Sequence, residues 1–584
     1  MTSTNVTPDM RVAHVSFMPG ASHLKLQLCL HDDLKTFHRS ISEKLDRIRY
    51  RLQLLASNRS IGKKKRKNRV KDGVAPTVSV KFYDVEGQEL NENSLTVGDA
   101  LMRTKNLKIG DETFVVLHNQ PLVTGLKILD PVMAGIAVNP LPETEFCNAN
   151  ECSWQWFRLD KDEIKNEETL KTLVTTERRY IPTNIDIGCR FYVKCHAPII
   201  QSEFAHDIHI KVMTMPVQPG PNRDVFKERK WRGATTAVEQ YPDAVDTFRV
   251  MSYNVLYDGY ATTEHAQKYL FPYVDASAMK ETRRIQLILQ EIEENNSDIV
   301  CLQEMGEHVY TKYFEPVLTL IGYRGFYSGK SGTTNEGCAT FVRLDRFNVT
   351  KEVTVNLGTA VNNSTNPASQ NLMHAFPEIA KGINQAPSIA QIFVLRSKIG
   401  FARTIILSNT HLFYRGDAHL IRLLQGAAVV ECISQQKAAS GFENAAVVMC
   451  GDWNACPEAA LTSFLLDGHV DSSHNHWQQA PSFHWNVSRI DENNVRRRIQ
   501  NSTPIHLDRF EHDLQLVSAC GIPAFTNYVT TFVDTLDYIL VGSKVLQVRG
   551  VFPFFTEDEV THEVALPSST FPSDHVSLVC DLSW

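Results

Sequence analysis

Several features that would assign this chain to a particular class are missing from its sequence. No apolar run approaches the roughly 18 residues that a membrane-spanning helix needs. Neither a GxSxG elbow nor a GxxxxGKS/T loop occurs, so serine-hydrolase and P-loop readings have no support. The twelve cysteines lack framework spacing, and most lie in apolar strand-like runs. We therefore expect reduced, buried thiols and an intracellular protein with no membrane partner.

The composition is that of a large globular protein. The chain has 584 residues, of which 43% are hydrophobic and 22% charged, and this length predicts about two to four domains. A net charge of −6 argues against a protein that coats nucleic acid over its whole surface, but it leaves room for a local basic groove. The first 20 residues lack a hydrophobic signal core and only faintly imitate a mitochondrial presequence, so they do not decide the compartment.

The N-terminal part divides into three segments by residue composition and hydrophobic periodicity. Residues 34–58 show apolar positions at helical spacing, and GKKKRKNRVK at 62–71 is a solvated basic run, with nuclear targeting or RNA contact as alternatives. We therefore predict an N-terminal helix and a basic, partly disordered segment over 1–75. Short alternating runs over 76–215 predict an antiparallel β-sandwich-like domain, and the Pro/Gly-rich stretch that follows predicts a linker over 216–245.

Residues 246–584 follow a different pattern. Short apolar strands alternate with longer segments, several of which have the periodicity of helices. This pattern predicts two packed sheets with helices outside them, a two-sheet α/β sandwich. The whole chain is therefore expected to be an α+β protein in which a β-rich domain precedes this larger domain.

Polar residues recur at the ends of the strands in this larger domain. Six strands deliver acids, amides or imidazoles: Asn254, Glu304, Asn409, His411, Asp452, Asn454, Asp537, Asp574 and His575. Buried carboxylates cost several kcal/mol unless they are paired or bind a cation. Because strand ends at one edge of a rigid sheet are where chemistry usually lies, we expect these residues to form one site.

The residue types indicate phosphodiester hydrolysis. The oxygen donors Glu304, Asp452, Asn454 and Asn254 suit Mg²⁺ or Mn²⁺ and not a soft metal. Imidazoles with nearby acids supply oriented proton donors. A hard cation together with imidazoles can neutralise the charge of a pentacovalent phosphate while an activated water attacks in line.

The ordered motifs SYNVL, LQE, NTHL, GDWN, LDYI and SDH resemble the exonuclease–endonuclease–phosphatase superfamily over residues 246–584. SYNVLYDGYA followed by FPYV resembles its deadenylase branch, and YIPTNIDIGCRF in the β-rich region extends the resemblance to most of the chain. In this branch the fourth motif is usually GDFN. Here tryptophan replaces that phenylalanine between Asp452 and Asn454, which changes the side-chain volume at this position but not the types of ligand on either side.

The resemblance implies a role for each site residue. Glu304 is the principal Mg²⁺ ligand, the amide of Asn254 completes the metal shell, and Asp574 is an outer-shell or second-metal ligand. Asp452 is the catalytic aspartate, and Asn454 holds the substrate phosphate; both are also expected at the metal.

The resemblance also implies how the imidazoles act. His575 contacts the scissile phosphate and is oriented by Asp537, and His411 is a second phosphate-binding imidazole. Before the resemblance is considered, a rim or core histidine is the ordinary interpretation of His411.

The resemblance finally implies a substrate. Phe532 matches the adenine-stacking position, and Phe413, Tyr414 and Arg422 are further candidates for holding adenylate; packing for Phe413 and a solvated helix face for Arg422 are the alternatives. The implied activity is Mg²⁺-dependent removal of 5′-AMP from 2′,5′-linked oligoadenylate and from poly(A) tails. DNA is not an expected substrate, and the sequence names no protein partner.

Three alternatives to this activity stay open. One is a deadenylase without 2′,5′ activity, the second is an enzyme of another branch that acts on phosphoinositides or abasic DNA, and the third is a non-catalytic RNA-binding scaffold. The implied compartment is the mitochondrial matrix, with the cytoplasm as the alternative.

Overall fold

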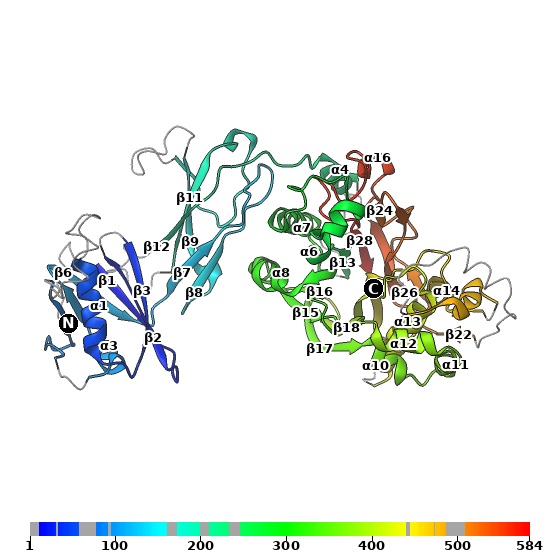
Figure 1. Ribbon diagram of the computed structural model, residues 1–584, viewed down its shortest axis with the longest axis horizontal. Coiled ribbons are helices and arrows are strands. Elements are labelled where there is room, and N and C mark those ends of the chain that lie inside the picture. The colour runs from blue at the N-terminus through cyan, green and yellow to red at the C-terminus, as the bar shows by residue number, and fades with distance from the viewer. Residues whose placement is uncertain are drawn as a thin grey trace. The chain divides into compact units, whose positions relative to one another are not determined.

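The computed structural model forms two compact units (Figure 1). It describes residues 11–30, 33–57, 78–91, 95–159, 172–198, 209–232, 246–439, 444–471, 473–485 and 509–584. The N-terminal unit comprises residues up to Gln218 except Gly135–Ala137, and the second unit comprises those three residues and Pro219–Trp584. Among the described residues, no helix is long and apolar enough to cross a membrane. The basic run at 62–71 and the first ten residues lie outside the described ranges.

A six-stranded sheet opens the N-terminal unit. Its strands are β1 (Arg11–Ser16), β2 (His23–Leu30), β3 (Asp33–Ser40), β4 (Val80–Tyr83), β5 (Asn106–Ile109) and β6 (Glu112–His118), in the order β3-β2-β1-β6-β5-β4. Helices α1 (Leu45–Ser57) and α3 (Val97–Arg103) contribute Ile48, Leu52 and Leu101 to the same hydrophobic core.

This sheet differs from two predictions for the N-terminal segment. The helix predicted over 34–58 is strand β3 followed by the shorter helix α1, because pairing with β2 places Phe37 in the core and overrides the local helical spacing. The predicted division at residue 75 falls within one sheet, since β1 pairs with β6. That pairing is parallel and involves a strand outside the range 76–215, within which the named strands pair antiparallel as expected.

A second sheet completes the N-terminal unit. It is antiparallel, in the order β10-β9-β11-β12, and a hairpin of β7 and β8 accompanies it. The strands are β7 (Leu122–Lys127), β8 (Leu141–Glu145), β9 (Ser153–Leu159), β10 (Thr172–Thr175), β11 (Arg190–His196) and β12 (His209–Met213). One face packs Trp154, Trp156, Phe191 and Val193 against Val123 of β7. The prediction of a β-rich region before the larger domain is confirmed.

Two six-stranded sheets form the second unit. The first has the order β15-β16-β14-β13-β28-β27, and the second has the order β17-β18-β19-β20-β26-β23. The first contains β13 (Thr247–Asn254), β14 (Ile299–Gly306), β15 (Tyr323–Gly329), β16 (Glu336–Arg343), β27 (Gln547–Val551) and β28 (Leu578–Ser583). The second contains β17 (Phe347–Asn356), β18 (Ile389–Ser397), β19 (Thr404–His411), β20 (Ala446–Asp452), β23 (Leu516–Ser518) and β26 (Asp537–Gly542).

The core of this unit lies between the two sheets. Val250 and Cys301 of the first sheet pack in one cluster with Leu407 and Val448 of the second. A second core joins the far face of the second sheet to helices α10 (Leu357–Asn362), α11 (Pro367–Ala375), α12 (Pro377–Gln385), α13 (His419–Ala439) and α14 (Ala460–Asp467). The predicted α+β class, with two packed sheets and helices outside them, is confirmed.

The remaining helices and short strands of this unit lie before or between the strands of these sheets. They are α4 (Asp224–Arg232), α6 (Asp258–Ala261), α7 (Glu281–Asn295), α8 (Glu307–Val309), α9 (Glu315–Leu320), α16 (Glu557–Val560), β21 (His469–Val470), β22 (Phe510–Glu511), β24 (Asn527–Val529) and β25 (Phe532–Asp534). The strands β24 and β25 pair as a hairpin.

Strand direction explains why the polar strand ends meet. Strand β13 is parallel to β14, and β19 is parallel to β20, so the carboxyl ends of each pair lie together. Strands β28 and β26 run antiparallel to β13 and β20, which brings their amino ends to the same edge. In this register Asp452 lies opposite both His411 and Asp537.

A buried ion pair on β13 and β28 predicts a large stability effect. Arg249 Nε and Nη2 donate to Asp581 Oδ1 and Oδ2 at 2.7 and 3.1 Å, and both side chains are buried. We expect Asp581→Ala to lower the free energy of unfolding of this unit by about 3–5 kcal/mol, because it leaves a buried guanidinium without its counter-ion.

Denaturant titration checks this expectation, with Asp345→Ala as the control. Asp345 pairs with Arg343 at the surface, so its loss should cost no more than about 1 kcal/mol. Equal losses in the two variants would contradict the assigned importance of the buried pair.

Candidate active site

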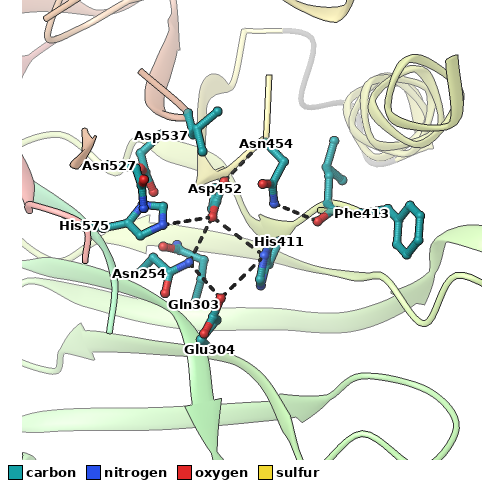
Figure 2. Close-up of polar contacts among 12 residues, drawn as sticks. Asn254, Gln303, Glu304, His411, Phe413, Asp452, Asn454, Asn527, Asp537 and His575 are labelled. Carbon is teal, nitrogen blue, oxygen red and sulfur yellow. Dashed lines mark hydrogen bonds and ion pairs between the residues drawn. The ribbon is translucent and has the colours of Figure 1, made fainter. Parts of the chain in front are cut away.

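The polar strand ends meet at one edge of the two-sheet unit (Figure 2). Asp452 lies at the centre of this group and is fully buried. Its Oδ2 accepts a hydrogen bond from Asn254 Nδ2 at 2.9 Å and lies 3.7 and 3.8 Å from the Nε2 atoms of His411 and His575. Burial and the charge of Asp537 raise the pKa of Asp452 well above its usual value. One carboxylate therefore faces two imidazoles.

His575 is held as a cation by its neighbours. Its Nδ1 donates to Asp537 Oδ2 at 2.7 Å. Burial alone would lower the pKa of His575, but the charges of Asp537, Asp574 and Asp452 outweigh it, so that the pKa lies well above its usual value. The ring therefore presents a protonated Nε2 toward Asp452.

Glu304 reaches the site through a distortion of β14. The pairing of β14 with β16 shifts register between Leu302 and Met305, and Glu304 between them has a left-handed φ of 57°. A β-bulge of this kind redirects a side chain that regular alternation would point elsewhere. Left-handed backbone at a non-glycine residue costs on the order of 1 kcal/mol, and such strain is concentrated at functional sites.

The carboxylate of Glu304 is engaged on both oxygens. Its Oε2 accepts from the backbone N–H of Tyr257 at 2.9 Å, and its Oε1 accepts from Asn254 Nδ2 at 3.3 Å. Burial and the charge of Asp574 raise its pKa. Asp574 lies beside the group, where Asn527 Nδ2 donates to its Oδ2 at 3.4 Å.

The two predicted amides have different contacts from those of metal ligands. Asn254 uses its Nδ2 to hold Glu304 and Asp452, while its Oδ1 accepts from the backbone of Leu256. Asn454 donates its backbone N–H to Asp452 Oδ1 and its Nδ2 to the carbonyl of Leu412. In this arrangement both amides hold neighbouring carboxylates and backbone groups in place. For Asn254 to act as an oxygen ligand of a metal, its side chain would have to rotate, because its Oδ1 already accepts from the backbone of Leu256.

The donor set fits a hard divalent cation. The carboxylates of Asp452 and Asp537 gather around His575, with ligand atoms of the three within 4.8 Å of one another, and the protonated ring balances only part of their charge. Among the residues that the structure describes, no donor reaches the buried Asp537 Oδ1. Glu304 and Asp574 form a second pair of neighbouring carboxylates whose charges disfavour each other. Buried acids grouped in this way are stabilised by a cation, and oxygen donors suit Mg²⁺.

Comparison with known proteins assigns this site to a family. Residues 251–575, more than half of the chain, match the model of the Endonuclease/Exonuclease/phosphatase family. The chain belongs to the endonuclease/exonuclease/phosphatase family. Residues 120–207 match a second model, described as the 2′,5′-phosphodiesterase 12-like N-terminal domain.

Individual relatives agree with this assignment. Human 2′,5′-phosphodiesterase 12 is 30% identical over 98% of this chain and 94% of its own length. The Arabidopsis thaliana protein Carbon catabolite repressor protein 4 homolog 1 is 28% identical over 58% of each chain. The crystal structure of ANGEL2, described as a 2′,3′-cyclic phosphatase, is 23% identical, covers 58% of this chain and 95% of that one, and has a TM-score of 0.46. The family match and the relative that aligns over nearly the whole chain show that this chain is an enzyme, a hydrolase of the phosphodiesterase and exonuclease type.

The predicted adenylate-holding residues separate into two pairs. Tyr414 is 72% exposed, and Phe532 in the β24–β25 hairpin is 41% exposed, so both rings are open to a ligand. Phe413 is buried and stacks on Trp485 with ring centroids 5.2 Å apart. Core packing, the alternative interpretation of Phe413, is what the structure shows.

Arg422 has partners that differ from the predicted phosphate. It is buried, and its guanidinium donates to the carbonyls of Phe413, Arg415 and Gly416. Because these bonds engage both terminal nitrogens, we correct its role: Arg422 holds the loop that carries Tyr414. Burial also excludes the solvated helix face that was the alternative.

The structure adds Lys330 to the site residues that the sequence predicted. Its Nζ binds Glu336 Oε1 at 2.6 Å and donates to His411 Nδ1 at 3.0 Å. A donor at Nδ1 leaves the proton of the neutral ring on Nε2, which faces Asp452 and Glu304. Burial and the charge of Lys330 lower the pKa of His411 well below its usual value. His411 is therefore a neutral N–H donor.

Two further residues that the sequence analysis did not assign lie under the site. Gln303 Nε2 donates to Asn409 Oδ1 at 2.8 Å, which links β14 of one sheet to β19 of the other. Gly451 allows the close approach of β19 and β20, since a Cβ there would lie 2.3 Å from the carbonyl oxygen of Thr410. Gln303 and Gly451 are motif letters in LQE and GDWN, whereas no motif marks Lys330.

Lys330 can be tested by removing its charge and its hydrogen bond. We expect Lys330→Met to lower kcat for a short oligoribonucleotide about 10- to 100-fold, as loss of an orienting partner commonly does, because the His411 ring loses its fixed tautomer. Glu336, whose pKa burial raises to about 7, can take up a proton in the variant, so the fold should persist by circular dichroism.

Lys351→Met is the matched control. Lys351 lies on the exposed strand β17, away from the site, and its Nζ donates to Gln436 of α13. Its kcat should stay within about twofold of the original, within the range of ordinary surface substitutions. An unchanged kcat in Lys330→Met would contradict the role of Lys330.

Proposed function

We propose that this enzyme is a Mg²⁺-dependent 3′-exoribonuclease that degrades 2′,5′-linked oligoadenylate and removes poly(A) tails, releasing 5′-AMP. The observation that carries the proposal is the meeting of Asp452 with a cationic His575 and a neutral His411 at one strand edge. These groups match the needs of a transition state in which negative charge develops on phosphate oxygens.

Each of these residues has a distinct task in the proposal. The Nε2–H of His575 donates to a phosphate oxygen, and Asp537 keeps that ring oriented and charged. The Nε2–H of His411, fixed by Lys330, donates to the phosphate from the opposite side of Asp452. Asp452 Oδ2 lies between the two donors and accepts a proton from the attacking water.

Glu304 and Asp574, with Asp452 facing them, are the residues that would hold Mg²⁺, and Mn²⁺ could substitute. The bound cation supplies Lewis-acid stabilisation of charge on the phosphate. Asn254 contributes by fixing Glu304 and Asp452 in one geometry, since a single amide nitrogen donates to both.

The 2′,5′ part of the proposal is supported by coverage along the chain. The relatives named 2′,5′-phosphodiesterase 12 align over nearly the whole chain, and the match at residues 120–207 is to the N-terminal domain described for that enzyme. The relatives named as Carbon catabolite repressor protein 4 homologues cover less of it. Exposed Tyr414 and Phe532 are the residues proposed to stack on adenine.

The cellular compartment of the enzyme is also a proposal. We infer the mitochondrial matrix from the family resemblance, with the cytoplasm as the alternative. All twelve cysteines are free thiols, which suits either reducing compartment. Imaging the full chain with a C-terminal fluorescent tag tests this point, and exclusion from mitochondria would overturn it.

The substrate is tested by measuring AMP release from three ligands. We expect turnover of 2′,5′-triadenylate and of a 3′-terminal oligoadenylate in Mg²⁺, no turnover of abasic duplex DNA, and loss of all activity in EDTA. Hydrolysis of the 3′,5′ substrate alone would leave a deadenylase without 2′,5′ activity. Turnover of the abasic duplex alone, or full activity in EDTA, would refute the proposal.

Single variants test whether this site performs the reaction. Glu304→Ala and Asp452→Ala should each abolish turnover while circular dichroism stays unchanged, because a lost metal ligand or catalytic acid costs at least a few kcal/mol of activation free energy. Retention of more than about a tenth of the activity in either variant would contradict the assigned roles. Full activity in both would favour catalysis elsewhere in the chain.

A further inference from the structure

Tyr260 of helix α6 lies beside the active site and has no task in the reaction proposed above. Its hydroxyl donates to Glu336 Oε1 at 3.4 Å. Glu336 also binds Lys330, which in turn donates to His411 Nδ1. Burial raises the pKa of Tyr260, and the charges of Glu336 and Glu304 raise it further, so the hydroxyl is close to both carboxylates. The hydroxyl end of Tyr260 therefore belongs to the site.

The ring of Tyr260 is partly open to solvent. The residue is 44% exposed, although its hydrogen-bond partner Glu336 is fully buried. Tyr257 supports the ring in a T-shaped contact, with ring centroids 5.1 Å apart. The backbone N–H of Tyr257 donates to Glu304 Oε2, so the ring has a fixed position relative to the site. An exposed and positioned aromatic ring next to a phosphate-binding site is suited to stacking on a base.

A buried arginine fixes the short helix that carries Tyr260. Arg284 is 1% exposed, and its Nη1 donates to Asp258 Oδ1 at the start of α6. Its Nη2 donates to the carbonyls of Val255 and Leu256 at 2.6 Å, in the segment just before the helix. A ligand that stacks on Tyr260 therefore meets a segment that is already ordered, which lowers the entropy cost of binding.

Phe532, the proposed stacking residue for adenine, belongs to the His575 side of the site. It lies in β25, which pairs with β24. Asn527 of β24 forms a bridge with His575, and its Nδ2 donates to Asp574 Oδ2 at 3.4 Å. The backbone N–H of Tyr528 donates to the carbonyl of Asp574 at 3.1 Å. These bonds join the hairpin to the segment that carries His575.

Tyr260 belongs to the opposite side. Figure 2 shows His575 and His411 on the two sides of Asp452. The contacts of Tyr260 lead to Lys330 and so to His411, not to His575. The site thus has an exposed ring on each side of its central carboxylate.

We propose that Tyr260 forms a second nucleotide subsite, which holds the base of the penultimate nucleotide while the terminal adenine stacks at Phe532. The two bases of a dinucleotide flank the phosphate that joins them. A site that holds this phosphate at Asp452 and one base at Phe532 therefore receives the other base on the opposite side, where Tyr260 lies. The inference rests on the proposed function, because it names the nucleotide that the same site takes on its second side.

The test measures binding of two labelled trimers in Mg²⁺ by fluorescence anisotropy. One is 3′,5′-linked triadenylate with hydrolysis-resistant phosphorothioate linkages, and the other is the same trimer without its middle base. We expect Tyr260→Ala to bind the intact trimer about tenfold more weakly and the trimer without the middle base within about twofold, since one stacked base is lost only in the first case. Tyr260→Phe keeps the ring, so it should bind both trimers as the unaltered chain does.

Tyr269→Ala is the matched control. Tyr269 lies in the same part of the chain and is 58% exposed, and its ring packs against His265, outside the site. It should bind both trimers with the affinity of the unaltered chain. Circular dichroism checks that each variant is folded.

Three results would overturn the subsite. The first is an equal loss, or no loss, for the two trimers in Tyr260→Ala, since a tyrosine that only supports Glu336 acts whichever base is present. The second is a loss in Tyr260→Phe as large as that in Tyr260→Ala, which would assign the effect to the hydroxyl. The third is no measurable binding of the intact trimer by the unaltered chain.

Turnover separates this inference from the proposed function. If the unaltered chain releases no AMP from unmodified 2′,5′- or 3′,5′-triadenylate, the proposed function fails. The subsite still stands in that case if the phosphorothioate trimers bind in the expected pattern.

Discussion

Crowding of negative charge in a buried place is the constraint on which this active site depends. Glu304, Asp452 and Asp537 come from three separate segments and meet at one edge of the sheets, and Asp574 from a fourth segment lies close enough for its charge to act on Glu304. Burial raises the pKa of Glu304 and Asp452, and their acidic neighbours raise it further. A fold that keeps these groups together must offset their repulsion, and the polar contacts around them serve that purpose.

The offsetting groups also set the chemistry. Asp537 is balanced by His575, which thereby becomes a cation that faces the substrate. Lys330 neutralises Glu336 and, through its second contact, makes His411 a neutral donor. The two imidazoles on either side of Asp452 therefore carry different charges, because Asp537 stabilises the cation of His575 whereas Lys330 keeps His411 neutral. The Gln303–Asn409 hydrogen bond joins the two sheets beneath this arrangement.

The sequence predicts the site better than it predicts the N-terminal unit. The strand-end residues could be found because each lies at one end of a short apolar run, and strand direction alone brings such ends together. Lys330 could not be found, since it approaches His411 from a loop 81 residues away with no motif around it. The burial of Phe413 and Arg422 depends on packing with Trp485 and on loop carbonyls that no local pattern reveals. Strand β3 has helical spacing but is a strand, because its pairing with β2 decides its conformation.

Binding of Mg²⁺ to the buried acids is the most direct test of this account. Thermal unfolding of the full chain should be measured in EDTA and in excess Mg²⁺, alongside Glu304→Gln. A cation that binds only the folded state at about 100 times its Kd adds about 2.7 kcal/mol, so Tm of the unaltered chain should rise by several degrees. Glu304→Gln should lose most of that rise. An equal rise in both proteins, or none in either, would contradict the claim that a cation at Glu304 completes the site.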